Sequence, residues 1–411
     1  MCAVLALAGC HAQEPPVQPF RTGAEMFVQM LQNSAPRQVD YWQSLMSPET
    51  GVAVVANQSS LVGESHLVDT LLRLGLNVKA IFCPEHGFRG TAAAGERVDD
   101  AVDARTGLPL YSLYGKNKKP SDAQMKGIDI VVFDLQDVGC RFYTYLSTLH
   151  YVMEACADNN VLLIVLDRPN PNGHYVDGPV LDTARLRSFV GMHPVPIVYG
   201  MTIGEYALMI AGEHWLDIVD SDYYNPDAEH LFVMKMQGYC RDSVYALPIP
   251  PSPNLRNAHA VALYPSLCLF EGTNVSVGRG TDWPFEVVGT PYSKMWNRSS
   301  AFGNQKAPAM VFTPRGGKKC FGVDLRGVEP LPSIDLTWLK LMYNLSRPGM
   351  FFLKNNFFDK LAGTTELRRQ LERGAGEEEI RASWQEGLER FRTVRSRYLL
   401  YPDIAEEGRR E

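Results

Sequence analysis

Four short apolar runs, each followed directly by polar residues, constrain the fold of this chain more than any other feature. They read GVAVVANQ from Gly51, VKAIFCPEH from Val78, DIVVFDLQD from Asp129 and VLLIVLDRPN from Val161. Segments with helical periodicity lie between them, for example over residues 145–157. Near-continuous apolar strands that alternate with helices are typical of a parallel sheet covered on both faces. We therefore predict an α/β domain.

The polar residues that follow these strands predict a ligand site, because ligands of open parallel sheets bind at the carboxyl ends of the strands. Glu85 and His86 end one strand, and Arg89 follows close to two glycines. A carboxylic acid held near apolar surface has a raised pKa, which suits a general acid. We predict this role for Glu85, the alternative being a loop glutamate paired with Arg89. His86 is either a ligand contact or a hydrogen-bonded structural histidine.

The next strand is followed by Asp134, Asp137, Arg141 and Tyr143. Acids, an arginine and an aromatic ring together suit a sugar, because polar groups bind hydroxyls and ring faces cover the apolar side of the pyranose. The alternative is an Asp–Arg ion pair that braces the loop. We predict catalytic roles for the two aspartates and binding roles for Arg141 and Tyr143.

The fourth strand leads into DRPNPN, which contains Arg168, Asn170 and Asn172. Asparagine amides offer both a donor and an acceptor, so they suit hydroxyl and acetamido groups of a ligand. The alternative is a framework of Asx turns without ligand contact. We predict that all three side chains bind substrate.

The second half of the chain carries a further group of polar residues in PSPN and LFEGTNVSVGRGTDWPFE. Arg279 stands between glycines and can bind a carboxylate with two parallel hydrogen bonds. We predict that Glu286 is catalytic and that the others bind substrate: Asn254, Glu271, Asn274 and Arg279. The pattern GxGxxG is absent here, so nucleotide binding is not expected.

Proline placement predicts the domain organisation. Four prolines within residues 247–254 forbid a helix and interrupt strand pairing, so we place a junction there. We expect a leader and linker over 1–37, an α/β domain over 38–246 and a smaller mixed α+β domain over 247–411. The last of these should complete a cleft with the first.

The amino terminus, MCAVLALAGCHAQEPP, resembles a bacterial lipoprotein signal in which Cys10 is lipidated. No Lys or Arg precedes the apolar run, so we expect the natural start to lie further upstream. This pattern predicts a cell-envelope location, lipoprotein or periplasmic, with membrane contact only through a lipid on Cys10.

Composition excludes several other classes of function. A net charge of −6 without a basic tract argues against a nucleic-acid partner. Eight scattered cysteines without a CxxC pair predict buried small side chains rather than a disulfide framework or a zinc site.

Motifs along almost the whole chain resemble the exo-β-N-acetylmuramidase family NamZ, long catalogued as a domain of unknown function. They include PEHGFRG, FDLQDVGCRFYTY, LDRPNPNG, GMTIGE, PSPN and FEGTNVSVGRGTDWPFE, and the resemblance runs from about Tyr41 to Tyr401. It implies a Rossmann-like domain, a smaller C-terminal domain and a cleft between them. It also implies release of N-acetylmuramic acid from non-reducing ends of peptidoglycan fragments, with the catalytic glutamate of EHGFRG at Glu85.

The resulting hypothesis is a glycoside hydrolase that needs no metal or cofactor, with Glu85 as general acid. A second group would stabilise the oxocarbenium-like transition state. Candidates are the substrate's own acetamido oxygen or one of four carboxylates, Asp134, Asp137, Glu271 and Glu286. Candidate partners of the lactyl carboxylate are Arg279, Arg89, Arg141 and Arg168. Two alternatives stay open: a non-catalytic lipoprotein that binds cell-wall glycans, and a metal-dependent hydrolase that uses Glu85, His86, Asp134 and Asp137.

Overall fold

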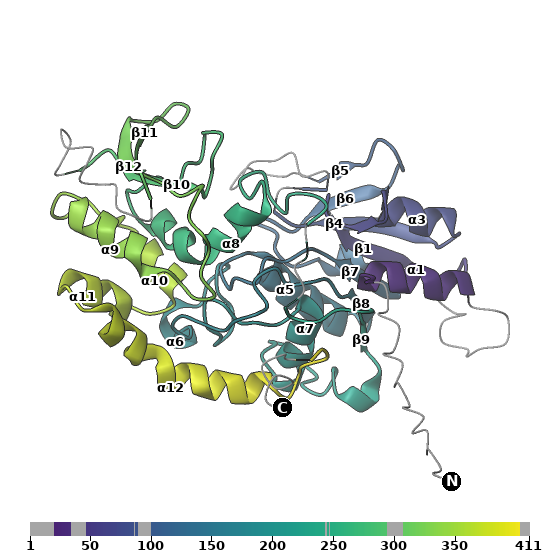
Figure 1. Cartoon of the computed structure of the whole chain (residues 1–411). Coiled ribbons are helices and arrows are strands. Elements are labelled where there is room, and N and C mark those ends of the chain that lie inside the picture. Colours follow the sequence, from purple (N-terminus) through teal and green to yellow (C-terminus); the bar gives the residue numbers. More distant parts are fainter. Residues whose placement is uncertain are drawn as a thin grey trace, which may run out of the picture.

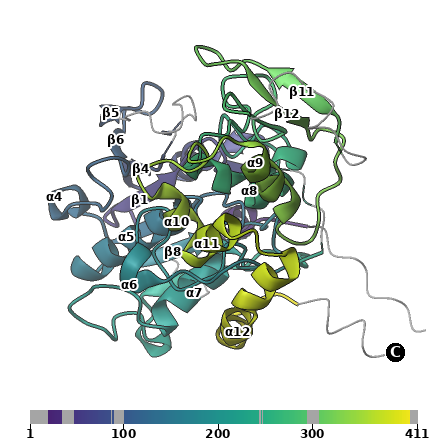
Figure 2. The same ribbon diagram turned by 90° about the vertical axis from the view of Figure 1, so that its left-hand side faces the viewer.

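The fold combines a large α/β part with a smaller part built on an antiparallel sheet (Figure 1). The smaller part lies to one side of the large sheet, and the last long helix runs from it back beneath the first part (Figures 1 and 2). The computed structural model describes residues 20–33, 47–85, 87–88, 100–242, 245, 247–293 and 307–402.

The central sheet has seven strands in the order β5-β6-β4-β1-β7-β8-β9, and every neighbouring pair is parallel except β5 and β6. Their bounds are β1 Val52–Ala56, β4 Val78–Cys83, β5 Ala101–Val102, β6 Pro109–Ser112, β7 Ile130–Asp134, β8 Leu162–Leu166 and β9 Leu231–Met234. The chain passes from β1 to β4 on one side and reaches β7 on the other. The loops at this reversal of strand order therefore meet at one edge, where ligands of such sheets bind.

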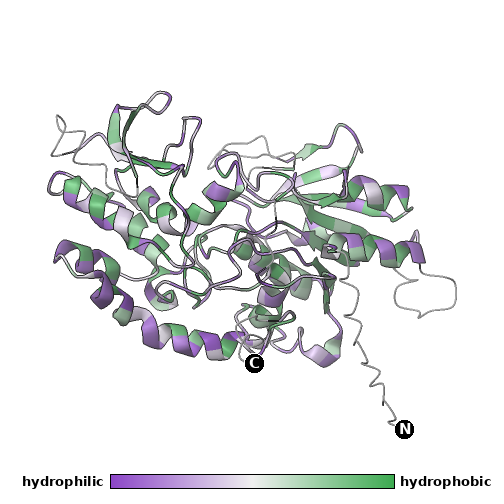
Figure 3. Ribbon diagram, viewed as in Figure 1, coloured by the Kyte–Doolittle hydropathy of each residue, from purple (hydrophilic) through white to green (hydrophobic). Residues whose placement is uncertain are grey.

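Helices cover both faces of the sheet, which confirms the predicted α/β class. Helices α1 (Gly23–Asn33) and α3 (Leu67–Arg73) pack on one face, whereas α5 (Tyr145–Asp158) and α7 (Ile203–Gly212) pack on the other. Successive side chains of β1 alternate between these two cores, and all five are fully buried. Figure 3 shows the hydrophobic colour along the sheet strands and more hydrophilic residues on the outer helices.

Helix α1 corrects the interpretation of residues 1–37 as leader and linker, because residues 23–33 fold onto the sheet. Its first backbone amide, that of Gly23, donates to the carbonyl oxygen of Asp167 at 2.8 Å. A Cβ at Gly23 would lie 2.3 Å from the backbone nitrogen of Asp167. The apolar side of the helix is buried through Phe27 and Leu31.

The smaller part begins with helix α8 and ends with helix α12. Its elements are α8 Ala258–Leu267, η2 Cys268–Gly272, β10 Val287–Thr290, β11 Ala309–Phe312, β12 Cys320–Asp324, α9 Leu336–Leu345, α10 Phe357–Ala362, α11 Glu366–Glu372 and α12 Glu377–Arg395. The three strands form an antiparallel sheet in the order β10-β12-β11. Helix α12 returns to the first part, where Arg395 donates to the carbonyl oxygen of Gly200 and Arg381 pairs with Asp177 at 3.1 Å.

Two further apolar segments, whose composition suits strands, have other structures. Residues 267–277 contain the 3₁₀ helix η2, because a short apolar run does not distinguish a strand from a buried helical turn. Residues 196–200 form no strand, and within them only Val198 forms isolated bridges, to Cys140 and Asp177. Helix α7 begins with a capping box, in which the side chains of Thr202 and Glu205 accept hydrogen bonds from each other's backbone amides.

The six cysteines within the described ranges are free thiols. Cys83, Cys156 and Cys268 are buried, as predicted from their apolar surroundings. None of the helices in the described part of the chain has both the length and the hydrophobicity of a bilayer-spanning helix.

Candidate active site

A cavity of about 690 Å³ lies between the two parts of the molecule. One wall comes from the loops after β4, β6 and β7 of the large sheet and from the segment after the short helix α6 (Thr183–Leu186). The other comes from the segment before α8, from α8, η2 and the loop after η2, and from the first residue of α10. The first wall consists of Glu85, Tyr114, Gly115, Lys118, Phe142, Tyr143, Thr144, Phe189 and Val190. The second consists of Ser252, Leu255, Tyr264, Glu271, Arg279, Phe285 and Phe357.

Glu85 lies two residues beyond the end of β4 and is only partly exposed. Its Oε2 accepts a hydrogen bond of 2.9 Å from Thr144 Oγ1. Thr144 is the N-cap residue of α5, yet its side chain caps no backbone amide of that helix. The hydroxyl is therefore directed to Glu85, and the positive end of a 14-residue helix lies next to the carboxylate.

Tyr114 contacts the same carboxylate from the loop after β6. Burial, the negative charge of Glu85 and hydrogen bonding to it together raise the pKa of Tyr114 to about 12. Glu85 thus has two hydroxyl groups beside it, from Tyr114 and Thr144. Sequence analysis singled out neither residue. Tyr114 lies in a polar loop without a motif, and Thr144 looks like an ordinary helix cap.

Glu271 and Arg279 form the polar part of the opposite wall. Nε and Nη2 of Arg279 each lie 2.5 Å from Oε1 of Glu271. Burial lowers the pKa of Arg279, but the charge and hydrogen bond of Glu271, together with Tyr264 and Cys268, raise it above its ordinary value. Gly278 and Gly280 both have φ of +80°, which explains why Arg279 stands between glycines.

Aromatic rings supply most of the remaining surface. The guanidinium of Arg279 lies 5.2 Å from the ring centroid of Phe285, a non-glycine residue with φ of +58°. Such left-handed conformations cluster at functional sites. On the first wall, Tyr143 donates its hydroxyl to the carbonyl oxygen of Pro251 at 2.9 Å, which fixes the ring. The structure thus brings together Glu85, Tyr143, Glu271 and Arg279 of the residues named from the sequence.

Asp134 and Arg168 are not among the residues that line this cavity. Arg168 Nε lies 2.5 Å from Asp134 Oδ1, and Nη2 lies 2.8 Å from Oδ2, with both side chains almost fully buried. Arg168 also donates to the carbonyl oxygen of Leu61. The pair joins the ends of β7 and β8, which is the bracing role that sequence analysis left open.

Asp137 and Arg141 are also buried beneath the cavity wall. Asp137 Oδ2 accepts hydrogen bonds from the hydroxyl of Tyr199 and from the amide of Gly139, and burial raises its pKa to about 6. Arg141 donates to three backbone carbonyl groups and is 1% exposed, and burial lowers its pKa to about 9. These carbonyl groups belong to Pro179, Val195 and Leu361.

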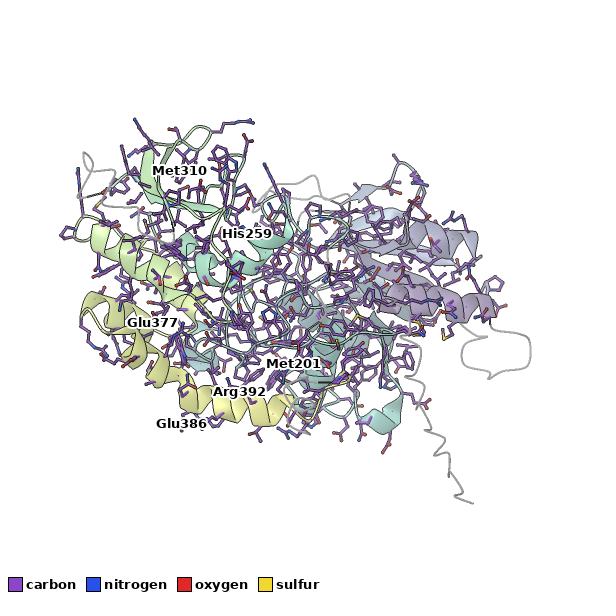
Figure 4. All side chains as sticks on the ribbon, in the orientation of Figure 1. Met201, His259, Met310, Glu377, Glu386 and Arg392 are labelled. Carbon is purple, nitrogen blue, oxygen red and sulfur yellow. The ribbon has the colours of Figure 1, made fainter. Side chains whose placement is uncertain are left out.

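The remaining residues named from the sequence lie outside this set of lining side chains. Asn170 and Asn172 donate to backbone carbonyl groups and connect the loop after β8 to its neighbours. Asn274 donates to the carbonyl oxygen of Met350. Glu286 accepts from Asn257 and from His259 of α8, whose position Figure 4 labels. Asn254 is partly exposed in the preceding loop, and His86 and Arg89 lie outside the described residues.

The described residues contain no group of three or more His, Cys, Asp or Glu side chains arranged to hold a metal ion. Two of the four ligands in the metal-dependent alternative, Asp134 and Asp137, make the buried contacts given above. That alternative therefore lacks two of its ligands at the cavity.

The fold and the cavity define an α/β protein with a candidate active site between a sheet domain and a smaller domain, with carboxylates on both walls and aromatic rings around them. That combination is typical of carbohydrate-active hydrolases. The chain belongs to the exo-beta-N-acetylmuramidase NamZ family, a family of glycoside hydrolases. The family's N-terminal domain model matches residues 52–259, and its C-terminal domain model matches residues 262–401.

Known proteins support this membership. The chain is 39% identical over 344 residues to the peptidoglycan beta-N-acetylmuramidase NamZ of Bacillus subtilis, covering 79% of this chain and 80% of that protein. It is also similar to two crystal structures of DUF1343 family proteins from Bacteroides fragilis. One has a TM-score of 0.77 at 40% identity and the other 0.76 at 28%. Each match covers 94% of this chain and 100% of the other.

Proposed function

We propose that this chain releases N-acetylmuramic acid from the non-reducing ends of peptidoglycan fragments, with Glu85 as general acid. The observation that carries the proposal is the presence of Glu85 and Glu271 on opposite walls of one cavity. Glycoside hydrolysis commonly uses two carboxylates that flank the scissile bond. The membership in the NamZ family supplies the class of substrate.

The shape of the cavity fits this substrate class. Its volume of about 690 Å³ lies within the range of small-molecule sites, about 300–1,000 Å³. Ring faces of Tyr143, Tyr264 and Phe285 line it, and such faces cover the apolar side of a pyranose. A cavity of this size accepts a terminal sugar and suits an enzyme that acts at chain ends.

In the first step, Glu85 gives its proton to the glycosidic oxygen while the bond from that oxygen to the anomeric carbon breaks. Thr144 and Tyr114 can accept from the protonated acid and donate to the carboxylate, because a hydroxyl is both donor and acceptor. Glu271, paired with Arg279, faces the positive charge that develops on the sugar. It either attacks the anomeric carbon or directs a water to it, and the substrate's acetamido oxygen is the alternative nucleophile.

The decisive experiment changes Glu85 to Gln and compares two substrates. With a sugar leaving group, which needs a proton, we expect kcat to fall about 100- to 10,000-fold. With a dinitrophenyl β-N-acetylmuramide, which leaves without protonation, the fall should be much smaller. Glu64→Gln is the matched control, at an exposed glutamate in the turn between β2 (Leu61–Val62) and β3 (Ser65–His66). Equal losses on both substrates, or wild-type turnover of both, would refute the acid role of Glu85.

The cell envelope is the compartment that this function requires, and we place the protein there as a lipoprotein through Cys10. The support is the Leu-Ala-Gly-Cys sequence at residues 7–10, which lies outside the described part of the structure. In the full-length precursor, Cys10→Ser should move the protein from the detergent-extracted membrane fraction to the soluble fraction. An unchanged distribution would contradict lipid anchoring without affecting the proposed activity.

A further inference from the structure

The cavity contains a cation that sequence analysis did not name. Of the four arginines expected to bind a substrate carboxylate, Arg141 donates to backbone carbonyl groups. Arg168 and Arg279 are each paired with a carboxylate of the protein. Arg89 lies outside the described residues. A substrate carboxylate that bound Arg279 would therefore compete with a pair already formed.

Lys118 differs from these arginines. It lines the cavity and is partly buried, and its Nζ lies 4.8 Å from the ring centroid of Phe189. Across the described residues, no carboxylate oxygen lies within 4.0 Å of this ammonium group. The adjacent Lys119 shows the contrast, since its Nζ lies 3.3 Å from Glu154 and 2.6 Å from Asp158. The charge of Lys119 is thus compensated by two carboxylates, whereas Lys118 has no such partner in the described part of the chain.

The ring beneath Lys118 is held in place by its surroundings. Ser147 Oγ donates to the backbone carbonyl of Phe189 at 2.7 Å. The Phe189 ring stacks at 21° on Tyr151 and lies 6.1 Å from Tyr114. A fixed aromatic face attracts a cation, so Lys118 is positioned before ligand arrives.

This cationic corner lies on the same wall as the proposed general acid. Tyr114 links the two, because it interacts with Glu85 and packs against Phe189. Val190 and the Phe189 ring add apolar surface beside the ammonium group. A ligand that combines a carboxylate with a small apolar group fits this corner.

We propose that Lys118 and Phe189 recognise the lactyl substituent of muramic acid, the carboxylate pairing with the ammonium group and the methyl group packing on the ring. This inference rests on the proposed function and names the residues that select the substrate. Lys118 distinguishes N-acetylmuramic acid from N-acetylglucosamine, which lacks the lactyl group. The Glu271–Arg279 pair, which carries no net charge, contacts the sugar instead.

The test measures competitive inhibition by N-acetylmuramic acid and by its lactyl methyl ester, which keeps the shape but loses the charge. Wild-type enzyme should bind the acid about ten- to a hundredfold more tightly than the ester, the effect of one charge-assisted hydrogen bond. In Lys118→Met the two inhibitors should bind within about twofold of each other. On a muramide substrate this variant should have a raised KM and a kcat close to that of wild type.

Two control variants isolate the charge at this position. Lys118→Arg should keep most of the preference for the acid. Lys116→Met, an exposed lysine in the same loop, should behave as wild type. The preference should also weaken as ionic strength rises, because salt screens a partly exposed ion pair.

An acid-to-ester ratio that is unchanged in Lys118→Met would overturn the proposal. So would an equal loss of affinity for both inhibitors, because that pattern indicates a structural role. In either case turnover of the muramide by wild-type enzyme would leave the proposed function standing. Failure of wild-type enzyme to cleave any muramide would instead count against the proposed function.

Discussion

The carboxyl edge of the central sheet and the cavity above it contain the same kinds of side chain in different states. At the sheet edge, Asp134 and Arg168 are 0% and 2% exposed and are joined by two hydrogen bonds. In the cavity, Glu271 and Arg279 are 22% and 35% exposed and keep part of their surface toward the space between the walls. Sequence alone describes both pairs as an acid near an arginine.

The difference in burial assigns the two pairs to different tasks. Removing one partner of a fully buried pair leaves an uncompensated charge in the interior, which costs much of a domain's stability. A partly exposed pair contributes little to stability, so it can serve a ligand instead. The predictions below test this division, beginning with the largest expected effect.

Loss of Arg168 should affect folding rather than chemistry. We expect Arg168→Met to lower the free energy of unfolding by about 3–5 kcal/mol, because Asp134 is then left buried and unpaired. Urea denaturation measures this change. The matched variant Arg279→Met should cost less than about 1 kcal/mol. Equal costs for the two variants would contradict the division between a structural pair and a functional pair.

Loss of the Glu271 carboxylate should affect catalysis rather than folding. Glu271→Gln should reduce kcat/KM on a muramide about 100-fold, because the cavity loses one of its two carboxylates. Its free energy of unfolding should stay close to that of wild type. Glu286→Gln is the comparison, since Glu286 is held by Asn257 and His259 away from the lining residues. If kcat/KM per folded molecule fell as much in Glu286→Gln as in Glu271→Gln, Glu286 would be the second catalytic carboxylate instead.

The sheet could be predicted because its signal is local. Buried parallel strands are short apolar runs, and helices have apolar residues at helical spacing. The elements that were predicted correctly show one of these two patterns. Local composition was misleading near Cys268. The apolar residues there suit a strand, but after α8 they form the 3₁₀ helix η2. Helix α1 was missed because its sequence follows a leader-like segment.

The site could be predicted only in part because its signal is not local. Glu85 was identified from its place at a strand end, but Thr144, its partner, lies 59 residues further along the chain. Lys118 and Lys119 are adjacent and chemically identical, yet only one of them lines the cavity. Asp134 and Asp137 lie at or just after the end of β7 as Glu85 lies after β4. The conformation of the loops determines that the two aspartates are buried and that Glu85 lines the cavity. Such contacts depend on loop conformation rather than on periodicity.

The buried Asp137 provides a test through pH. Burial raises its pKa to about 6, while in the unfolded chain the value is near 3.8. The folded protein therefore holds this proton more tightly, and stability from this group is lost as pH rises from about 4 to 6. Asp137→Asn should remove the effect, so the variant should gain roughly 2–3 kcal/mol over wild type between pH 4 and pH 7. Denaturation of both proteins across this pH range measures the difference, and a flat difference for Asp137→Asn would contradict the buried assignment.

The smallest expected effect concerns the two hydroxyl groups beside Glu85. Thr144→Val should lower kcat about five- to tenfold, the value of one hydrogen bond of about 1 kcal/mol, and shift the alkaline limb of the kcat–pH profile, where the general acid loses its proton. Thr144→Ser restores the hydroxyl and should recover most of the rate. Tyr114→Phe should produce a change of similar size, because its hydroxyl interacts with the same carboxylate. A helix cap with a purely structural role would lower the melting temperature in Thr144→Val and leave the pH profile unmoved, and that result would place Thr144 with the buried edge rather than with the cavity.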